Sequence, residues 1–275
     1  MELVVFDLDG TLLNSESVIS TYTRETLDML TDRGVAYTVA TGRTLHASRD
    51  VLDGHGFALP QAYKNGVVIW HPDHRRYSHR NILTTGELAA VVSACMTEGL
   101  APFVFTLEGD TDLNVYHPPL KSAAEKHVVM EYSVRRGIAA HPLAEIPADA
   151  EISNISAIGD KALIKAVIGF VKEQPHLVAY SGVAVESKDL YWLDVHHSDA
   201  SKGGAIQTLK QLVGAERVVC FGDSDNDASM FAAADESYAP ENAKSTIKSL
   251  ATAVIGHHDQ DGIARFLRER FSLPG

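Results

Sequence analysis

The chain has 275 residues, of which 45% are hydrophobic and 22% charged, as is ordinary for a globular protein of one large or two modest domains. Its 36 acidic and 24 basic residues give a formal net charge of −12, which argues against a general affinity for nucleic acid or anionic membranes. No basic and apolar leader opens the sequence, and no apolar run approaches the ~20 residues of a membrane span, so we expect a cytoplasmic protein.

Strands and helices alternate at the beginning of the chain. An apolar run at 3–8 predicts a buried strand, and residues 18–34 have apolar side chains near helical spacing before a glycine. Residues 36–41 predict a second strand, and 44–54 a second helix. Uninterrupted apolar strands joined by helices indicate a parallel sheet that is covered on both faces.

The middle of the chain has a different pattern, in which strands follow one another with fewer helices between them. Its predicted elements are strands at 102–107, 113–117, 151–158, 177–182 and 191–197, and helices at 86–99 and 161–174. The Pro- and Gly-containing stretch 137–150 should be an exposed connection. The stretch 71–80, rich in histidine and arginine, should be a solvated hinge into this region rather than a zinc site.

The last third of the chain returns to the alternation of the first. Its predicted elements are helices at 201–214, 227–235 and 261–271, and strands at 217–223 and 253–256. We therefore predict an α/β fold with a doubly wound, Rossmann-like parallel-sheet core of residues 1–80 and 197–275. Residues 81–196 should form an α+β domain inserted into that core.

Ligands of doubly wound sheets bind at the carboxyl ends of the strands, so the polar residues at those ends are the candidates for a site. Four segments supply them: Asp7 and Asp9 after the first strand, Thr41, Gly42 and Arg43 after the second, Lys202 at a helix start, and Asp223 and Asp227 in GDSDND. Asp7 and Asp9, two residues apart on a strand, should start on the same face and diverge at the turn that Gly10 permits.

Each of these features has an ordinary explanation when it is taken alone. An aspartate pair after a strand often serves only to form a turn. Thr41 could be a helix cap, and Lys202 could be a solvated charge at the surface. The alternate aspartates of GDSDND could suggest an EF-hand calcium loop that begins at Asp223. This interpretation fails, because the sixth and twelfth positions of such a loop would be Ala228 and Ala234 instead of glycine and glutamate. Paired histidines at 257–258 should belong to a surface loop.

Together the four segments form a chemically consistent set. Carboxylates crowded at one edge repel each other unless a cation binds between them, and hard oxygen ligands suit Mg²⁺. Mg²⁺ and Lys202 would attract a phosphate despite the acidic protein around them, and Thr41 with backbone N–H groups could hold its remaining oxygens. An aspartate is a known nucleophile for phosphoryl transfer.

The motifs DLDGT, ATGR, SKG and GDSDND, in this order, resemble the four signatures of the haloacid dehalogenase superfamily. The long insertion, the pair Asn65-Gly66 and the late stretch 241–264 are similar to its Cof-type sugar-phosphatase branch. The resemblance covers the expected core, and in the middle of the chain it rests on position and length.

The resemblance implies a role for each matching residue. Asp7 would attack phosphorus, Asp9 would act as acid and base, and Thr41 and Lys202 would hold the transferring phosphoryl group. Mg²⁺ would bind to Asp7, Asp223 and the main-chain carbonyl of Asp9, with Asp227 in support. The residues that would lie near the substrate are Gly42, Arg43, Asn65, Gly66, Asn226 and Asn242.

We therefore expect a Mg²⁺-dependent phosphatase, a monomer or weak dimer, that hydrolyses a small phosphomonoester through an aspartyl-phosphate. The phosphorylated metabolite would be a sugar phosphate or a phosphorylated cofactor, and the inserted domain would act as a cap that closes over the site and sets specificity. The alternatives are a phosphomutase and a non-catalytic sensor of a phosphorylated metabolite.

Overall fold

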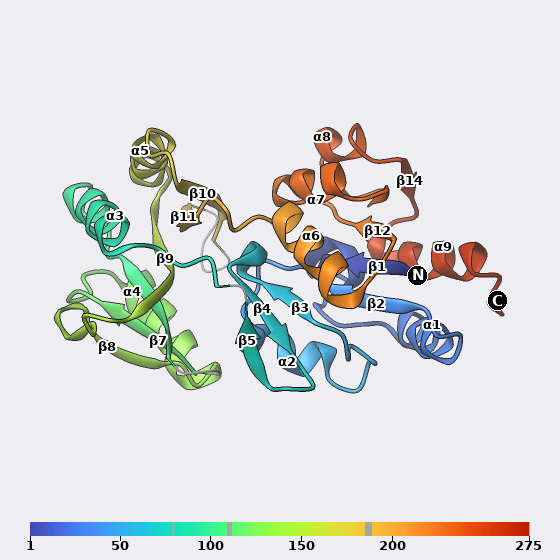
Figure 1. Cartoon of the computed structure of the whole chain (residues 1–275). Coiled ribbons are helices and arrows are strands. Elements are labelled where there is room, and N and C mark those ends of the chain that lie inside the picture. The colour runs from blue at the N-terminus through green and yellow to red at the C-terminus, as the bar shows by residue number, and fades with distance from the viewer. Residues whose placement is uncertain (79, 109–111, 185–188, 275) are drawn as a thin grey trace. The chain divides into compact units, whose positions relative to one another are not determined.

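The computed structural model describes residues 1–78, 80–108, 112–184 and 189–274 (Figure 1). The chain forms two compact units, which are called here the core, residues 1–78 and 200–275, and the inserted domain, residues 79–199. Over the described ranges, no helix is both long and apolar enough to cross a membrane.

The core is built on a five-stranded sheet in which every pair of neighbouring strands is parallel. Its strands, in spatial order, are β14 (Ala253–Ile255), β13 (Glu236–Pro240), β12 (Arg217–Phe221), β1 (Glu2–Phe6) and β2 (Ala36–Val39). The first strand of the chain therefore lies between one strand from the N-terminal segment and one from the C-terminal segment (Figure 1).

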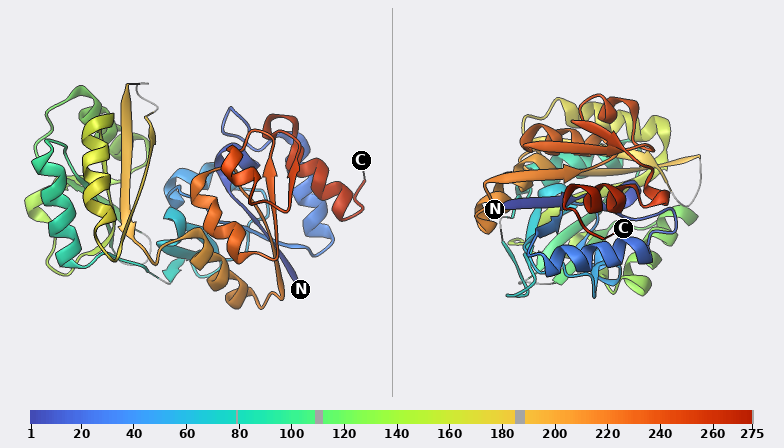
Figure 2. Two further views of the ribbon diagram at one scale, coloured as in Figure 1. Left: turned by 90° about the horizontal axis from the view of Figure 1, so that it is seen from above. Right: turned by 90° about the vertical axis from the view of Figure 1, so that its right-hand side faces the viewer.

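Helices cover both faces of this sheet (Figure 2). They are α1 (Thr21–Asp32), α2 (Leu45–Leu52), α6 (Lys202–Val213), α7 (Ala228–Ala233), α8 (Ser245–Lys248) and α9 (Gly262–Arg270). Side chains of β1 alternate between the faces: Val4 and Phe6 pack with leucines of α1 and α9, whereas Leu3 and Val5 pack with α6, α7 and α8. Burial on both faces explains why β1 is an uninterrupted apolar run.

A small antiparallel sheet follows α2 in the core. It consists of β3 (Gln61–Tyr63), β4 (Val68–His71) and β5 (Arg76–Ser78). The prediction of a solvated hinge at 71–80 was wrong for residues 71–78, because β4 and β5 pair there as a hairpin that buries Tyr77 against Trp70. The strands of this hairpin are too short, and have too few apolar residues, to be recognised within a polar stretch.

The inserted domain has a six-stranded sheet. In spatial order its strands are β10 (Leu177–Val183), β11 (Leu190–His197), β9 (Glu151–Asp160), β6 (Phe103–Glu108), β7 (Asp112–His117) and β8 (Ala139–Pro142). Helices α3 (Thr85–Thr97) and α5 (Lys161–Lys172) pack on one face of it around an apolar cluster, and α4 (Ala123–Met130) completes the domain. The stretch 137–150 is not only a connection, because β8 pairs with β7 in parallel.

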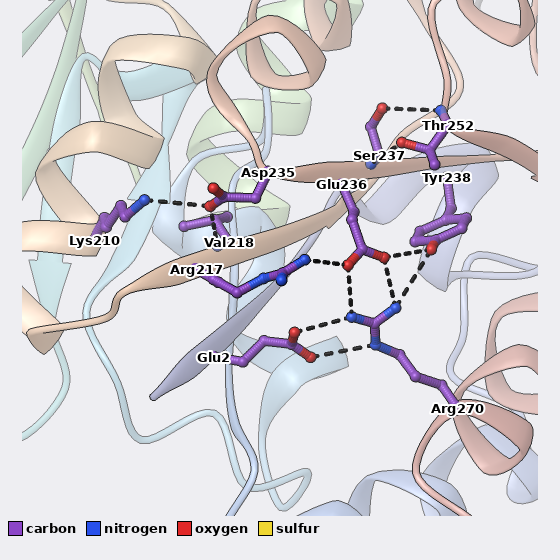
Figure 3. A network of polar contacts seen from close by, with 10 residues as sticks. All are labelled: Glu2, Lys210, Arg217, Val218, Asp235, Glu236, Ser237, Tyr238, Thr252 and Arg270. Atoms are coloured by element: carbon purple, nitrogen blue, oxygen red, sulfur yellow. Dashed lines mark hydrogen bonds and ion pairs between the residues drawn. The ribbon is translucent and has the colours of Figure 1, made fainter.

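The predicted fold class is thus confirmed: a doubly wound parallel α/β core carries an inserted α+β domain. At the amino ends of the core strands, Arg270 of α9 donates to Glu2 of β1 (Nη2 to Oε2, 2.9 Å) and to Glu236 of β13 (Nη1 to Oε2, 2.7 Å; Figure 3). This network ties the C-terminal helix to two strands at the edge opposite their carboxyl ends.

Candidate active site

The first candidate carboxylate follows immediately after β1. The strand ends at Phe6, and the amide of Asp7 still donates to the carbonyl of Phe221 at the end of β12 (2.9 Å). Residues Leu8–Leu12 then form a π-helical turn, in which Gly10 has a φ of +73°. Asp7 itself still has extended backbone angles (φ −71°, ψ 163°), and the chain turns after it. The side chain of Asp7 is buried whereas that of Asp9 is largely exposed, so the two carboxylates diverge at this turn. The need for glycine at position 10 holds, since a side chain there would also meet Asp223.

Lys202 connects two of the predicted acids. It is the first residue of α6, whose N-cap Ser201 accepts a hydrogen bond from the amide of Gly204. The Nζ atom of Lys202 lies 2.5 Å from Oδ1 of Asp7 and 2.6 Å from Oδ1 of Asp227, and all three side chains are buried. Lys202 is therefore not the solvated charge that it could have been when taken alone.

Asp223 and Asp227 are held in fixed orientations by the loop after β12. Oδ2 of Asp227 accepts the amides of Asp223 and Ser224, each at 2.9 Å. The carboxylate of Asp223 accepts hydroxyl hydrogen bonds from Thr11 (3.3 Å) and Ser224 (2.9 Å). One oxygen of Asp227 is thus used by the backbone and the other by Lys202, while Asp223 is oriented from both sides.

The pKa values of the site reflect burial and charge crowding. Burial raises the pKa of Asp7 well above its usual range, and the neighbouring carboxylates of Asp227 and Asp223 raise it further against the opposing effect of Lys202. Burial and Asp227 likewise raise the pKa of Asp223. Burial alone would lower the pKa of Lys202, but the carboxylates of Asp227 and Asp7 raise it above the ordinary value.

These three carboxylates fit a divalent cation. Asp7, Asp223 and Asp227 each offer an oxygen, and the three atoms lie within 4.8 Å of one another. When all three are ionised, the single ammonium of Lys202 leaves the group with an excess of two negative charges in a largely buried position. A hard cation with oxygen ligands would neutralise this excess, and carboxylates are the ligands that Mg²⁺ takes in proteins.

Asp9 lies outside this buried group and pairs with a different residue. Its side chain is 58% exposed, and Arg43 holds it in a two-pronged contact: Nε to Oδ2 at 2.8 Å and Nη2 to Oδ1 at 2.5 Å. The remaining nitrogen, Nη1, donates to the carbonyl of Ala47 in α2 at 3.1 Å. Arg43 is thus fixed by Asp9 and α2, a contact that the sequence did not predict.

The loop after β2 brings Thr41 and Gly42 to the same edge. Thr41 is buried, and its hydroxyl accepts the amide of Arg43 at 3.1 Å. Asn65 lies in the turn after β3, and its backbone N–H donates to the carbonyl of Thr41 (2.9 Å). Its side-chain oxygen accepts a hydrogen bond from Nδ2 of Asn226, also at 2.9 Å. A side chain at Gly42 would approach that oxygen to 3.3 Å, so the loops from β2, β3 and β12 meet here.

The last two predicted substrate residues have structural contacts. Gly66 has a φ of +93°, and a Cβ atom at this position would lie 2.6 Å from the carbonyl oxygen of Ser201, which precedes Lys202. Asn242 donates Nδ2 to the carbonyl of Gly10 at 2.7 Å, and so it holds the turn that contains Asp9. Gly66 therefore allows close packing of the turn after β3 against the start of α6.

Two residues of the site were not given a role from the sequence. Thr11 and Ser224 orient the Asp223 carboxylate through their hydroxyl groups. Both lie inside the quoted motifs DLDGT and GDSDND, so their position was visible, but hydroxyl residues are common in turns and nothing in the pattern indicated which acid they would contact.

Comparisons with known proteins agree with this geometry. The family model of the haloacid dehalogenase-like hydrolases matches residues 4–267. Two relatives from Bacillus subtilis (strain 168) are 28% identical: 5-amino-6-(5-phospho-D-ribitylamino)uracil phosphatase YwtE, with 99% of both chains covered, and phosphatase YwpJ, with 98% of this chain and 99% of the relative covered. A solved haloacid dehalogenase-like hydrolase from Bacteroides thetaiotaomicron superposes with a TM-score of 0.77 at 23% identity, over 98% of this chain and 99% of its own. The resemblance noted from four short motifs thus extends along nearly the whole sequence, and the chain belongs to the haloacid dehalogenase-like hydrolase family.

Proposed function

We propose that the protein is a Mg²⁺-dependent phosphatase that hydrolyses a small phosphomonoester through an aspartyl-phosphate on Asp7. The observation that carries the proposal is the contact between Asp7 and Lys202, in one buried group with Asp223 and Asp227. One oxygen of Asp7 faces the ammonium, so the other is left as a nucleophile in a fixed position. Such positioning is a large part of the catalysis of phosphoryl transfer.

In the first half of the reaction, a carboxylate oxygen of Asp7 attacks phosphorus and the bond from phosphorus to the ester oxygen breaks. The departing alkoxide takes a proton from the carboxyl group of Asp9. Asp9 is paired with Arg43 at 2.5 to 2.8 Å, and it must exchange this partner for the ester oxygen. Its high exposure leaves room for such a movement.

In the second half, Asp9 takes a proton from water, and the resulting hydroxide attacks the phosphorus of the acyl phosphate. The bond between phosphorus and the Asp7 oxygen breaks, and inorganic phosphate and the free Asp7 carboxylate result. Lys202 stabilises the charge on the phosphoryl oxygens in both halves, and Thr41 with the backbone amides of its loop offers further donors. Lys202 also neutralises Asp7 each time that its carboxylate is regenerated.

Asp7, Asp223 and the backbone carbonyl of Asp9 would hold Mg²⁺, and Asp227 would support them. The bound ion would draw negative charge from the phosphoryl oxygens and shield the substrate dianion from the carboxylates. Imidazole and thiol groups are absent from the three-carboxylate group, which favours a hard ion over zinc.

For the substrate, we propose a sugar phosphate or a phosphorylated cofactor, selected by the inserted domain acting as a cap. The name of the relative YwtE describes a phosphorylated ribitylamino-uracil, which combines a polyol phosphate with a heterocycle. Gly42, Arg43, Asn65, Gly66, Asn226 and Asn242 would surround the phosphate end of the substrate.

The test is phosphate release from a panel of phosphorylated polyols, sugars and cofactors, with Mg²⁺ or with a chelator. Wild type is compared with Asp7→Asn and with Asp225→Asn, a nearby exposed acid that forms an ion pair with Lys244 at the surface. We expect metal-dependent release that Asp7→Asn abolishes and Asp225→Asn preserves. Phosphate release that persists in Asp7→Asn would show that Asp7 is not the nucleophile. An isomerised product without free phosphate would identify a phosphomutase instead, and binding without any turnover would identify a sensor.

A further inference from the structure

A second group of metal-binding side chains lies in the core, outside the three-carboxylate site. It consists of His257, His258 and Asp259, in the turn between β14 and α9. Each offers one ligand atom, and these three atoms lie within 4.8 Å of one another. The prediction of a plain surface loop does not describe His258, whose side chain is only 12% exposed.

The hydrogen bond of His258 determines which of its ring nitrogens is available. Nδ1 lies 2.8 Å from the carbonyl oxygen of Leu13, and since a carbonyl can only accept, Nδ1 carries the proton. In the neutral ring the lone pair is then on Nε2, which lies 3.6 Å from Oδ2 of Asp259. At this separation the two atoms are near enough to bind one metal ion together.

The carboxylate of Asp259 is oriented in the same way. Its Oδ1 accepts the amide of Ser15 at 2.7 Å, which leaves Oδ2 for the two histidines. Nδ1 of His257 lies 4.0 Å from that oxygen and accepts the amide of Asp259 at 3.2 Å, a hydrogen bond that a metal ion would replace. Metal-binding histidines usually donate their other N–H to a carbonyl, as His258 does, and ligating carboxylates are hydrogen-bonded in turn.

We propose that His257, His258 and Asp259 form a binding site for a divalent transition-metal ion of the zinc type. Two imidazoles and one carboxylate suit Zn²⁺, Co²⁺, Ni²⁺ or Cu²⁺, and they suit Mg²⁺ poorly. Three protein ligands leave a fourth tetrahedral position for water. The site differs from the proposed Mg²⁺ site in its ligand chemistry and shares no residue with it.

Bound metal would stabilise the segment that carries the nucleophile. The ligands are connected to this segment through Leu13 and Ser15, which follow the π-helical turn after Asp7. The amide of His258 also donates to Oδ1 of Asn242 (3.2 Å), whose Nδ2 holds the carbonyl of Gly10. An effect of zinc on turnover would rest on the proposed phosphatase function, whereas binding of zinc does not.

The experiment is a calorimetric titration of the full chain with Zn²⁺ in the presence of excess Mg²⁺, which occupies the carboxylate site. We compare wild type with His258→Asn, because the Asn amide can still donate to Leu13 while the Nε2 ligand is lost, and with Asp259→Asn. The matched control is His197→Asn: Nδ1 of His197 accepts the amide of Asp199 at 3.2 Å and lies 3.6 Å from its Oδ2, but no three-ligand group occurs there among the described residues.

We expect one Zn²⁺ per chain, with affinity reduced at least about tenfold in His258→Asn and Asp259→Asn and unchanged in His197→Asn. Zn²⁺ should also raise the Tm of wild type and leave that of His258→Asn unchanged. The Tm of each protein in chelator shows whether the substitution itself has impaired folding. Equal affinity in wild type and the two site variants, or an equal loss in the control, would overturn the proposal and leave the group as histidine–aspartate ion pairs. These readouts do not depend on phosphatase activity.

Discussion

Replacing Arg270 by methionine should lower the stability of the core by about 2 kcal/mol without changing its chemistry. The guanidinium joins Glu2 and Glu236 at the amino ends of two strands, and Nη1 also lies 3.4 Å from the hydroxyl of Tyr238 (Figure 3). Methionine keeps the apolar stem and removes all of these hydrogen bonds. The network lies at the edge of the sheet opposite the candidate site.

The magnitude follows from the pKa of Glu236. Hydrogen bonds from Arg270, with one from Tyr238, lower that pKa from its ordinary value of 4.5 to about 2. At about 1.4 kcal/mol for each pKa unit, this corresponds to at most about 3.5 kcal/mol of stability, of which the Tyr238 share stays when Arg270 is replaced. The side chains of Arg270 and Glu236 are each 20% exposed, so solvent screening reduces the value, and about 2 kcal/mol is the expected loss.

The assay is urea unfolding of the core at several pH values. Because the folded-state pKa of Glu236 is depressed, its contribution is complete above about pH 4.5 and is lost as the pH falls towards 2. Wild type should therefore lose more stability between pH 7 and pH 3 than Arg270→Met does. Arg217→Met is the control, since the guanidinium of Arg217 also donates to Glu236 (2.6 Å) but its side chain is 56% exposed.

The reasoning would be refuted if Arg270→Met cost less than about 0.5 kcal/mol at pH 7, or if Arg217→Met cost as much. It would also be refuted if both proteins lost stability in parallel as the pH fell, because the acid sensitivity would then come from other groups. Phosphate release by Arg270→Met should match wild type at a temperature where both are folded.

Three further predictions concern the candidate site. Lys202→Met should reduce phosphate release by more than about a thousandfold, because it removes the charge that we propose to stabilise the phosphoryl group and leaves the buried carboxylates of Asp7 and Asp227 without their shared ammonium; unchanged kcat would exclude Lys202 from the chemistry. Gly203→Ala should destabilise the core by about 2 kcal/mol, since its Cβ would lie 2.5 Å from a backbone carbonyl oxygen, whereas Gly204→Ala, exposed in the same helix, should be neutral or stabilising in thermal unfolding. Adding Mg²⁺ should raise the Tm of wild type and have little effect on Asp223→Asn, and an equal rise in both would place the cation elsewhere.

Much of the core could be predicted from the sequence because β1, β2 and β12 are mainly apolar runs, but β13 (ESYAP), which also belongs to the core sheet, was missed. Burial on both faces makes β1 and β12 continuous hydrophobic segments, and amphipathic spacing with a cap such as Ser201 marks the helices. Short elements were missed where this signal fails. β3, β4 and β5 have three or four residues each, and β8 has exposed and half-buried positions with a proline at its end.

The sequence predicted which residues of the site lie close together better than it predicted the contacts between them. The carboxyl ends of parallel strands gather whatever follows them, so Asp7, Lys202, Asp223 and Asp227 could be placed together without coordinates. The pairing of Asp9 with Arg43 could not, because it depends on side-chain rotamers and on the π-helical turn after Asp7. The sequence indicated a turn at Gly10 but not its π-helical hydrogen bonds.

The position of β1 in the core sheet has a consequence for synthesis on the ribosome. One neighbour, β2, is translated within about 35 residues, but the other, β12, begins only at Arg217, after the whole inserted domain. At bacterial or eukaryotic elongation rates of about 5–20 residues per second, the nascent N-terminal segment waits on the order of ten seconds or longer with one edge of β1 unpaired. The inserted domain is continuous and can fold during this interval. Its length therefore sets how long one edge of β1 stays unpaired, and open to pairing with other chains, before the core sheet can close.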